Sequence, residues 1–181
     1  MRILVCGGRT YGHWRGIKKG TPTLNALYRE RLSQYLHTTK MLDKIIAHYC
    51  LWIELDGSFL PLDLTIISGG APGADTTAEN WAVNNHCDIE RFPADWERYG
   101  KRAGFIRNQE MLDKGKPDLV VAFPGGVGTK MMVRIATEAG VPVIKIKRGQ
   151  NEFQPVPVPP VRSKANKNTT RIGEKTVKGV P

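Results

Sequence analysis

Three short apolar runs of this chain each end in a pair of glycines: RILVCGG (2–8), LTIISGG (64–70) and DLVVAFPGG (118–126). Each run is continuously apolar and does not alternate with polar residues. This pattern is typical of a strand covered on both faces, as in a parallel sheet. The glycines allow positive φ and let a ligand approach the backbone closely. The repeated pattern therefore predicts a parallel sheet with several glycine loops at one edge.

The segments between these runs carry helical patterns. Apolar residues at helical spacing across 24–49 predict one long helix, or two helices broken near Thr38 and Thr39. Further expected elements are a strand at 141–147, a weaker strand at 87–94, a helix that carries Ala78 to Ala82, and helices at 102–114 and 129–139. Because strand and helix alternate, we expect an α/β fold: a Rossmann-like, doubly wound, mainly parallel sheet with helices on both faces.

The chain length and its local composition predict one domain and a tail. Residues 1–148 of the 181 residues form the expected domain, and two segments look inserted into it. The segment near 10–22 is glycine-rich and basic and predicts a surface loop, and the segment near 51–63 predicts a small hairpin or an extended connection. Residues 149–181 begin with a proline-rich stretch and continue as a basic, polar segment, which predicts a flexible tail.

Composition limits the classes of protein to which the chain can belong. No run approaches the roughly 18 to 20 apolar residues of a membrane span, and the N-terminus lacks the features of a signal peptide. Three cysteines without a CxxC pair favour reduced thiols, so we expect a cytoplasmic protein. The four histidines show no metal-ligand spacing, so neither a metal nor a cofactor is expected. The formal net charge of +10, of which +4 lies in residues 151–181, favours anionic partners.

The glycine loops differ in what they can bind. In an open parallel sheet, ligands bind beyond the carboxyl ends of the strands, where the three loops are expected to meet. In PGGVGT, Thr129 is expected to cap the following helix, whose first turn has no acidic residue, and Lys130 adds positive charge. This loop is a predicted phosphate cradle. In SGGAPGAD, Asp75 either caps the next helix or accepts hydrogen bonds from ribose hydroxyls.

The segment 94–112 lies between these two loops in the expected site. Arg107 can hold a phosphate or carboxylate through two parallel hydrogen bonds, or it can be a solvated helix residue. Trp96 can stack on a base or pack against the protein. The predicted ligand-binding residues are Gly7, Gly8, Arg9, Ser68, Gly69, Gly70, Gly73, Asp75, Trp96, Arg107, Asn108, Pro124, Gly125, Gly126, Gly128 and Thr129.

Four ordered motifs, RILVCGGRT, SGGAPGADTTAENWA, FPADWERYGKRAGFIRNQEML and VVAFPGGVGT, resemble the YspA/YpsA-related branch of the SLOG superfamily over about residues 1–147. The resemblance implies a Rossmann-like domain that binds nucleotides or nucleotide-derived ligands. Relatives in that superfamily include the lonely-guy phosphoribohydrolases, which cleave the N-glycosidic bond of nucleoside monophosphates, and Smf-type DNA-processing proteins. Several relatives form dimers or larger assemblies, so a homo-oligomer is compatible with the resemblance, with the helix from Leu24 as one available surface.

The resemblance implies that PGGVGT is the phosphate loop and that Arg107 matches an arginine of the hydrolases. The chain departs from those enzymes directly after this loop. They carry acidic residues there, one of them catalytic, whereas this chain has Lys130, Met131 and Met132. Cleavage of a glycosidic bond passes through an oxocarbenium-like state that a carboxylate stabilises. If the protein is an enzyme, the expected catalytic residues are Arg107, Asp75 and Glu79, although Glu79 can equally be a solvated surface residue.

Three functional hypotheses follow from these observations. The first is a binding domain for a nucleotide or nucleotide-derived small molecule, which acts as a sensor or a sequestering protein. The second is a hydrolase that cleaves an N-glycosidic or phosphoester bond of a nucleotide. The third is a nucleic-acid-binding protein that uses the basic tail, since the positive charge supports non-specific binding to phosphates.

Overall fold

The computed structural model describes residues 1–11, 24–50, 52–55, 58–61 and 63–158. Five parallel strands form one sheet in the order β5-β4-β1-β6-β7, with every pairing in parallel register. The strands are β1 (Arg2–Cys6), β4 (Thr65–Ser68), β5 (Asp88–Arg91), β6 (Leu119–Ala122) and β7 (Val143–Lys145). The expected α/β, Rossmann-like sheet is confirmed, including the weaker strand at β5.

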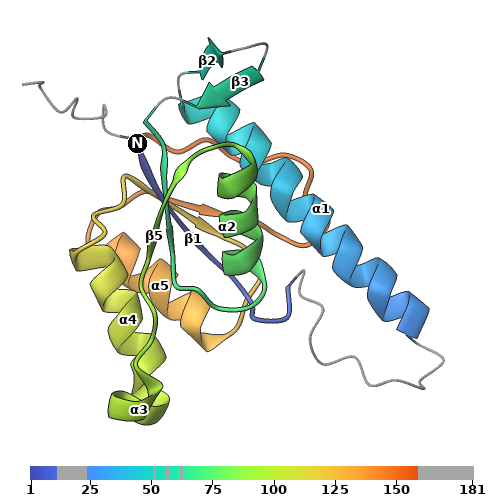
Figure 1. The fold of residues 1–181 in the computed structure, drawn as a ribbon. Helices are drawn as coiled ribbons and strands as arrows, with labels where there is room; N and C mark the ends of the chain where they lie inside the picture. Colours follow the sequence, from blue (N-terminus) through green and yellow to red (C-terminus); the bar gives the residue numbers. More distant parts are fainter. Residues whose placement is uncertain (12–23, 51, 56–57, 62, 159–181) are drawn as a thin grey trace, which may run out of the picture.

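Helices cover both faces of this sheet (Figure 1). Helix α1 (Leu24–Tyr49) and helix α2 (Ala74–Asn84) lie on one face, and helix α4 (Ala103–Asp113) and helix α5 (Val127–Glu138) lie on the other. Strand β1 shows why both faces must be covered. Its Ile3 and Val5 belong to the apolar core under α1 and α2, while Leu4 and Cys6 belong to the core under α4 and α5. The continuous apolar run thus reflects burial on both faces.

The order of the strands determines where a ligand can bind. From β1 the chain moves outward through β4 to β5, and it then returns to the other side of β1 to form β6 and β7. The connections after β1 and β6 therefore diverge although these two strands are neighbours. Such a switch point opens a crevice at the carboxyl ends of the strands. A short helix α3 (Trp96–Tyr99) and a 3₁₀ turn η1 (Gly100–Arg102) precede α4 on this side of the molecule.

Several local predictions can be compared with the described residues. Residues 24–49 form one continuous helix without a break at Thr38, whose hydroxyl donates to the Gln34 carbonyl one turn earlier. The segment near 51–63 forms the antiparallel hairpin β2 (Trp52–Leu55) and β3 (Ser58–Pro61). Most of the predicted surface loop at 10–22 lies outside the described residues, as do residues 159–181. No helix in the described part of the chain is long and apolar enough to cross a membrane.

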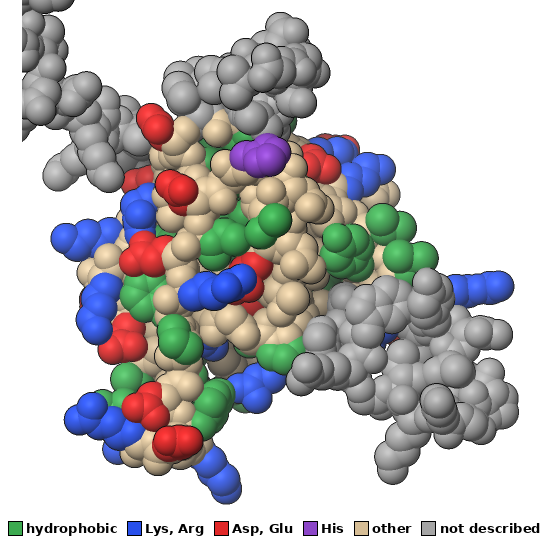
Figure 2. Space-filling model, viewed as in Figure 1, with side chains coloured by type: hydrophobic (Ala, Val, Ile, Leu, Met, Phe, Trp, Pro, Cys, Tyr) green, Lys and Arg blue, Asp and Glu red, His purple; other side chains and the backbone are tan. Residues whose placement is uncertain are grey.

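Charged side chains of both signs are interspersed on the face of the molecule shown in Figure 2. The formal charge of +10 is therefore not gathered into a single basic region on that face. The six Lys and Arg residues of the tail, at positions 162–178, all lie beyond the described residues.

Residues 149–158, named here the C-terminal segment, run along α1. Phe153 packs against the ring of His48 at a centroid distance of 5.6 Å, and Lys44 donates to the Asn151 carbonyl at 2.7 Å. The Tyr49 hydroxyl donates to the Val156 carbonyl at 3.0 Å and accepts from the Val156 N–H at 2.7 Å. The described part of the predicted tail is thus held against the domain by apolar contacts and by hydrogen bonds between side chains of α1 and the backbone of the tail.

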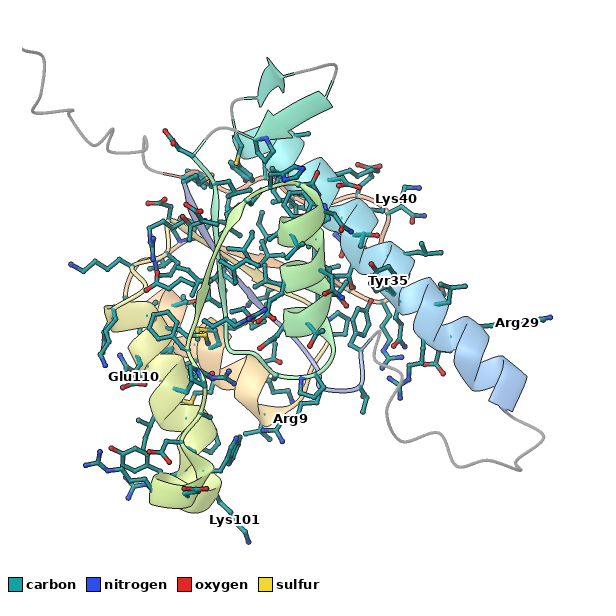
Figure 3. All side chains as sticks on the ribbon, viewed as in Figure 1. Arg9, Arg29, Tyr35, Lys40, Lys101 and Glu110 are labelled. Carbon is teal, nitrogen blue, oxygen red and sulfur yellow. The ribbon has the colours of Figure 1, made fainter. Side chains whose placement is uncertain are left out.

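The hydrogen bonds of the Tyr49 hydroxyl are expected to stabilise the folded protein. We expect Tyr49→Phe to lower the free energy of unfolding by about 1–2 kcal/mol, because two hydrogen bonds to the backbone of one residue are lost. Urea denaturation measures this change. Tyr35→Phe serves as the matched control, since Tyr35 lies on the same helix (Figure 3). The Tyr35 hydroxyl makes no hydrogen bond to another described residue. Equal stability of the two variants would contradict the prediction.

Candidate functional site

The three glycine loops meet at the carboxyl edge of the sheet. The Gly8 N–H donates to the Pro124 carbonyl at 3.0 Å, which joins the loop after β1 to the loop after β6. Gly73 has a φ of 96° and lies so close to the Gly8 carbonyl that any Cβ there would overlap it. The loop after β4 is thus packed against the loop after β1, and glycine is required at this contact by both conformation and space.

A cavity of about 340 Å³ opens between these loops and α4. Ten of the predicted ligand-binding residues line it: Gly7, Gly8, Arg9, Asp75, Trp96, Arg107, Asn108, Gly126, Gly128 and Thr129. The cavity is also lined by residues that the sequence interpretation missed: Cys6, Ala71, Lys101, Gly104, Phe105, Met111 and Val127. The apolar residues of this second set could not be predicted to line a cavity. Their spacing in the sequence is the same whether a side chain faces a cavity or packs in the core.

The N-terminus of α5 faces this cavity without a side-chain cap. The helix begins at Val127 after Gly126, and its first turn holds no acidic residue. Among the described residues, no side chain accepts from the first N–H groups of the helix. The predicted cap at Thr129 is wrong, because α5 begins two residues before Thr129, which therefore lies within the first turn. The uncapped N–H groups and the positive end of the helix dipole remain available to an anion.

Two glycines of this loop are required neither by backbone conformation nor by packing. A Cβ on Gly126 or on Gly128 would meet no described atom within 4 Å, and neither residue has a positive φ. Gly125 differs, because a Cβ there would overlap the Thr129 side chain. Gly126 and Gly128 thus leave the wall of the cavity bare, so that a ligand can contact the backbone directly.

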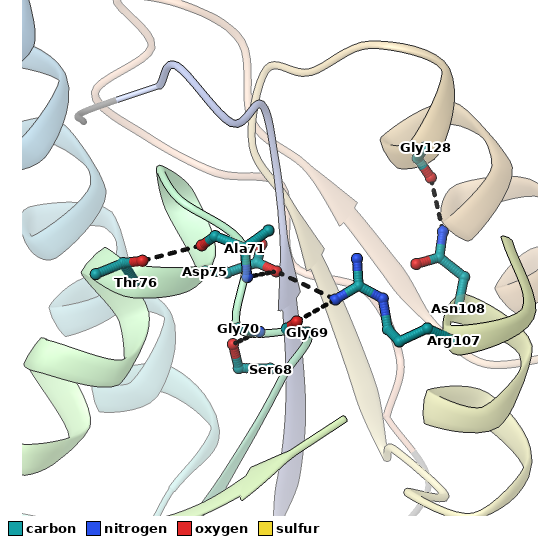
Figure 4. Close-up of polar contacts among 9 residues, drawn as sticks. All are labelled: Ser68, Gly69, Gly70, Ala71, Asp75, Thr76, Arg107, Asn108 and Gly128. Atoms are coloured by element: carbon teal, nitrogen blue, oxygen red, sulfur yellow. Dashed lines mark hydrogen bonds and ion pairs between the residues drawn. The ribbon is translucent and has the colours of Figure 1, made fainter. Parts of the chain in front are cut away.

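Arg107 crosses the site from α4 to the loop after β4 (Figure 4). Its Nη1 donates to the Gly69 carbonyl and lies 3.9 Å from Oδ2 of Asp75. Its side chain is only 11% exposed, so the interpretation as a solvated helix residue does not hold. Burial lowers the pKa of the guanidinium, while Asp75 acts in the opposite direction. The buried Nε has no hydrogen-bond partner among the described residues.

Asp75 lies inside the first turn of α2, where Gly73 occupies the N-cap position. The predicted N-cap role of Asp75 is therefore wrong. Its carboxylate turns back toward the preceding loop and accepts from the Ala71 N–H at 3.3 Å. Burial raises the pKa of this carboxyl group to about 6, although Arg107 and the Ala71 hydrogen bond favour the charged form. Asp75 is thus a buried titratable acceptor beside Arg107 in the cavity wall.

This raised pKa predicts that protonation of Asp75 stabilises the folded protein. The folded-state pKa of about 6 exceeds the ordinary value of 3.8, so the folded state binds the proton more tightly than the unfolded state. Relative to Asp75→Asn, which does not titrate, the native protein should gain about 2 kcal/mol of unfolding free energy between pH 7.5 and pH 4.5. Parallel urea denaturation of both proteins across this range measures the difference. A difference that is independent of pH would refute the assignment.

Asn108 connects α4 to the opposite side of the cavity. Its Nδ2 donates to the Gly128 carbonyl at 3.0 Å, and the side chain is buried (Figure 4). Trp96 lies at the mouth of the cavity, where the Arg9 guanidinium stacks over its ring at 4.9 Å. Arg9 itself lies beyond the carboxyl end of β1 (Figure 3). The cavity thus combines the uncapped N-terminus of α5, the buried ion pair of Asp75 and Arg107, and the exposed ring of Trp96.

The remaining predicted residues lie around this cavity and do not line it. Gly69 and Gly70 line a second, adjoining cavity of about 320 Å³, and the Ser68 hydroxyl accepts from the Gly70 N–H at 3.0 Å. Gly73, Pro124 and Gly125 hold the loops together through their backbones.

Glu79 lies outside both cavities. Its side chain is buried and pairs with Arg91 at 2.8 Å, which contradicts its interpretation as a solvated surface residue. Asp75 and Glu79 still lie one turn apart on α2, and Glu79 contributes to the raised pKa of Asp75.

Comparison with known proteins gives two matches. A family model described as "YspA, cpYpsA-related SLOG family" matches residues 1–99. A curated relative, the Gene 61 protein of Mycobacterium phage D29, is 44% identical over 93 residues, which cover 46% of this chain and 72% of the phage protein. The matched family region contains the first two glycine loops and Trp96, whereas Arg107 and the loop before α5 follow it in the sequence.

Proposed function

Because the chain belongs to the YspA, cpYpsA-related SLOG family, whose members are associated with nucleotide-related ligands, we propose that it binds a nucleotide or nucleotide-derived small molecule and acts as a sensor or sequestering protein. One observation carries the proposal: the uncapped N-terminus of α5, with its bare Gly126 and Gly128 positions, lines the same cavity as Arg107. A helix N-terminus and a guanidinium both favour a phosphate, so their shared cavity supports a phosphate position between them.

The other groups of the cavity fit the remaining parts of a nucleotide. Asp75 offers a carboxylate oxygen to ribose hydroxyls, and it lies beside Arg107. Trp96 and Phe105 are partly exposed at the cavity, where an aromatic face can stack on a base. The volume of about 340 Å³ lies at the lower end of the usual range for small-molecule sites.

Isothermal titration of the intact protein tests this proposal. A panel of nucleoside monophosphates, ADP-ribose and inorganic phosphate is titrated at fixed salt and pH 7.5. We expect at least one nucleotide to bind with 1:1 stoichiometry and more tightly than inorganic phosphate, because the ribose and the base add contacts. Absence of binding across the panel would contradict the proposal. Mass spectrometry of small molecules released from the purified protein extends the search to ligands outside the panel.

One observation supports hydrolysis as a second candidate function. Asp75 is buried in the cavity wall with a pKa of about 6, and perturbed carboxyl groups in cavities are frequent at catalytic sites. The start of α5 offers no carboxylate, since Lys130, Met131 and Met132 stand there and Met132 is buried in the core. Incubation with a nucleotide pool, followed by mass spectrometry, separates the two functions. Turnover that disappears in Asp75→Asn would favour a hydrolase, and recovery of unchanged ligand favours binding alone.

A further inference from the structure

The second cavity adjoins the first and shares four of its residues. Arg9, Ala71, Trp96 and Arg107 line both, so the two spaces meet around the Arg107 guanidinium. The second cavity continues along the loop after β4 and the segment after β5. Its remaining lining residues are Gly69, Gly70, Pro72, Arg91, Pro93 and Ala94. It is nearly as large as the first, at about 320 Å³.

Three guanidiniums line this second cavity, and none of its described lining residues is acidic. Arg107 is held by the Gly69 carbonyl, Arg91 is held by Glu79 at 2.8 Å, and Arg9 is held over the Trp96 ring. Arg9 has no acidic partner among the described residues. Because their backbones come from three different parts of the sheet edge, the three side chains converge from different directions. Planar guanidiniums of this kind bind phosphate and carboxylate groups through paired hydrogen bonds.

The positive charge of Arg9 beside Arg107 is unfavourable in the absence of an anion. Arg91, by contrast, is compensated by Glu79. Burial lowers the pKa of Arg107, and the neighbouring positive charge of Arg9 acts in the same direction. Asp75 compensates Arg107 only from the side of the first cavity. An anionic group among Arg9, Arg91 and Arg107 would offset this repulsion. The loop wall has room for it, because a Cβ on Gly70 would meet no described atom within 4 Å.

We infer that the two cavities together bind one nucleotide-type ligand that carries two phosphate groups, either on different hydroxyls of one ribose or joined directly as a pyrophosphate. One group is the phosphate at the N-terminus of α5, and the other binds among Arg9, Arg91 and Arg107. The inference rests on the proposed function, because it takes the first group from there. A nucleoside bisphosphate and a pyrophosphate-linked nucleotide share this chemistry, whereas a nucleoside monophosphate supplies only the first group.

Isothermal titration with matched probes tests this inference. The full chain is titrated with AMP, with adenosine 3′,5′-bisphosphate and with ADP-ribose at one pH and salt concentration. At least one of the two larger probes should bind about tenfold or more tightly than AMP, and which one does so identifies the position of the second group. Arg91→Gln, which changes a residue of the second cavity only, should remove this advantage by roughly ten- to hundredfold and leave AMP affinity within about twofold.

Two controls keep the result interpretable. Arg134→Gln removes another exposed arginine paired with a glutamate, at 3.6 Å from Glu138, but Arg134 lines neither cavity. It should leave the affinity of every probe within about twofold, which excludes a simple effect of net charge. In the single variant Arg91→Gln, the buried Glu79 carboxylate loses its cation, which can destabilise the protein. The double variant Arg91→Gln, Glu79→Gln removes both charges, so it provides the same binding test without an unpaired buried carboxylate.

The outcomes separate the two proposals. AMP binding with no gain from either larger probe, or an equal loss of all probes in Arg91→Gln, overturns the inference and leaves the proposed function intact. Failure of all three probes to bind the native protein contradicts both.

Discussion

Replacement of Arg107 by alanine is expected to weaken the binding of AMP by on the order of a hundredfold. The guanidinium lines the same cavity as the start of α5, and its Nη1 is already fixed by the Gly69 carbonyl. The substitution removes the donors of this guanidinium and also leaves the Asp75 carboxylate without its cation. A phosphate would then enter a cavity in which the Asp75 carboxylate is no longer paired with Arg107. Titration of AMP at pH 7.5 measures the loss.

Two variants show whether this loss is specific. Arg107→Lys keeps the positive charge but lacks the planar fork, so it should recover only part of the affinity. Arg134→Ala removes an exposed arginine of α5 outside both cavities and should have almost no effect. If Arg107→Ala bound AMP as tightly as the native protein, Arg107 would have no role in phosphate binding, and the proposed ligand position would be wrong.

Gly128→Ala is expected to stabilise the protein and weaken the binding of AMP by about tenfold or more. Gly128 lies in the first turn of α5, and a Cβ there meets no described atom within 4 Å. Alanine is the better helix former, so the free energy of unfolding should rise by up to about 1 kcal/mol. The added methyl group projects into the space that the phosphate would occupy. The two effects therefore have opposite signs.

These two readouts are measured on the same sample. Thermal denaturation without ligand should show an increase in Tm of about 2–4 °C, and titration should show the loss of affinity. The Asn108 hydrogen bond to the Gly128 carbonyl is retained, because it uses only the backbone of residue 128. A more stable variant with unchanged AMP affinity would show that the start of α5 is not the phosphate site. A less stable variant would show that the position does not accept a side chain.

The strands and the edge at which the loops meet could be predicted from the sequence, because each depends on a local pattern. The apolar runs at 2–6 and 119–122 are buried on both faces, and a continuous apolar run reports this burial directly. The sequence left open whether residues 24–49 form one helix or two, because the β-branched residues Thr38 and Thr39 weaken a helix. Packing of Met41, Leu42 and Ile45 in the core overrides that local preference.

The polar contacts of the site could not be predicted in the same way. The pairing of Glu79 with Arg91 depends on the position of β5 beside α2, which spacing along the chain does not reveal. A helix cap was expected at Thr129 and was one of two alternatives for Asp75, but glycines hold both N-cap positions. Helix α2 begins one residue before Asp75, and α5 begins two residues before Thr129. Loop geometry, rather than residue type, determines these helix starts.

The consecutive residues Arg107 and Asn108 give α4 a further property. Arg107 reaches the loop after β4, while Asn108 reaches the first turn of α5 on the opposite side of the cavity. Helix α4 is thereby tethered to the loops on both sides of the cavity. A ligand that bridges these two loops would have to match the distance at which α4 holds them apart.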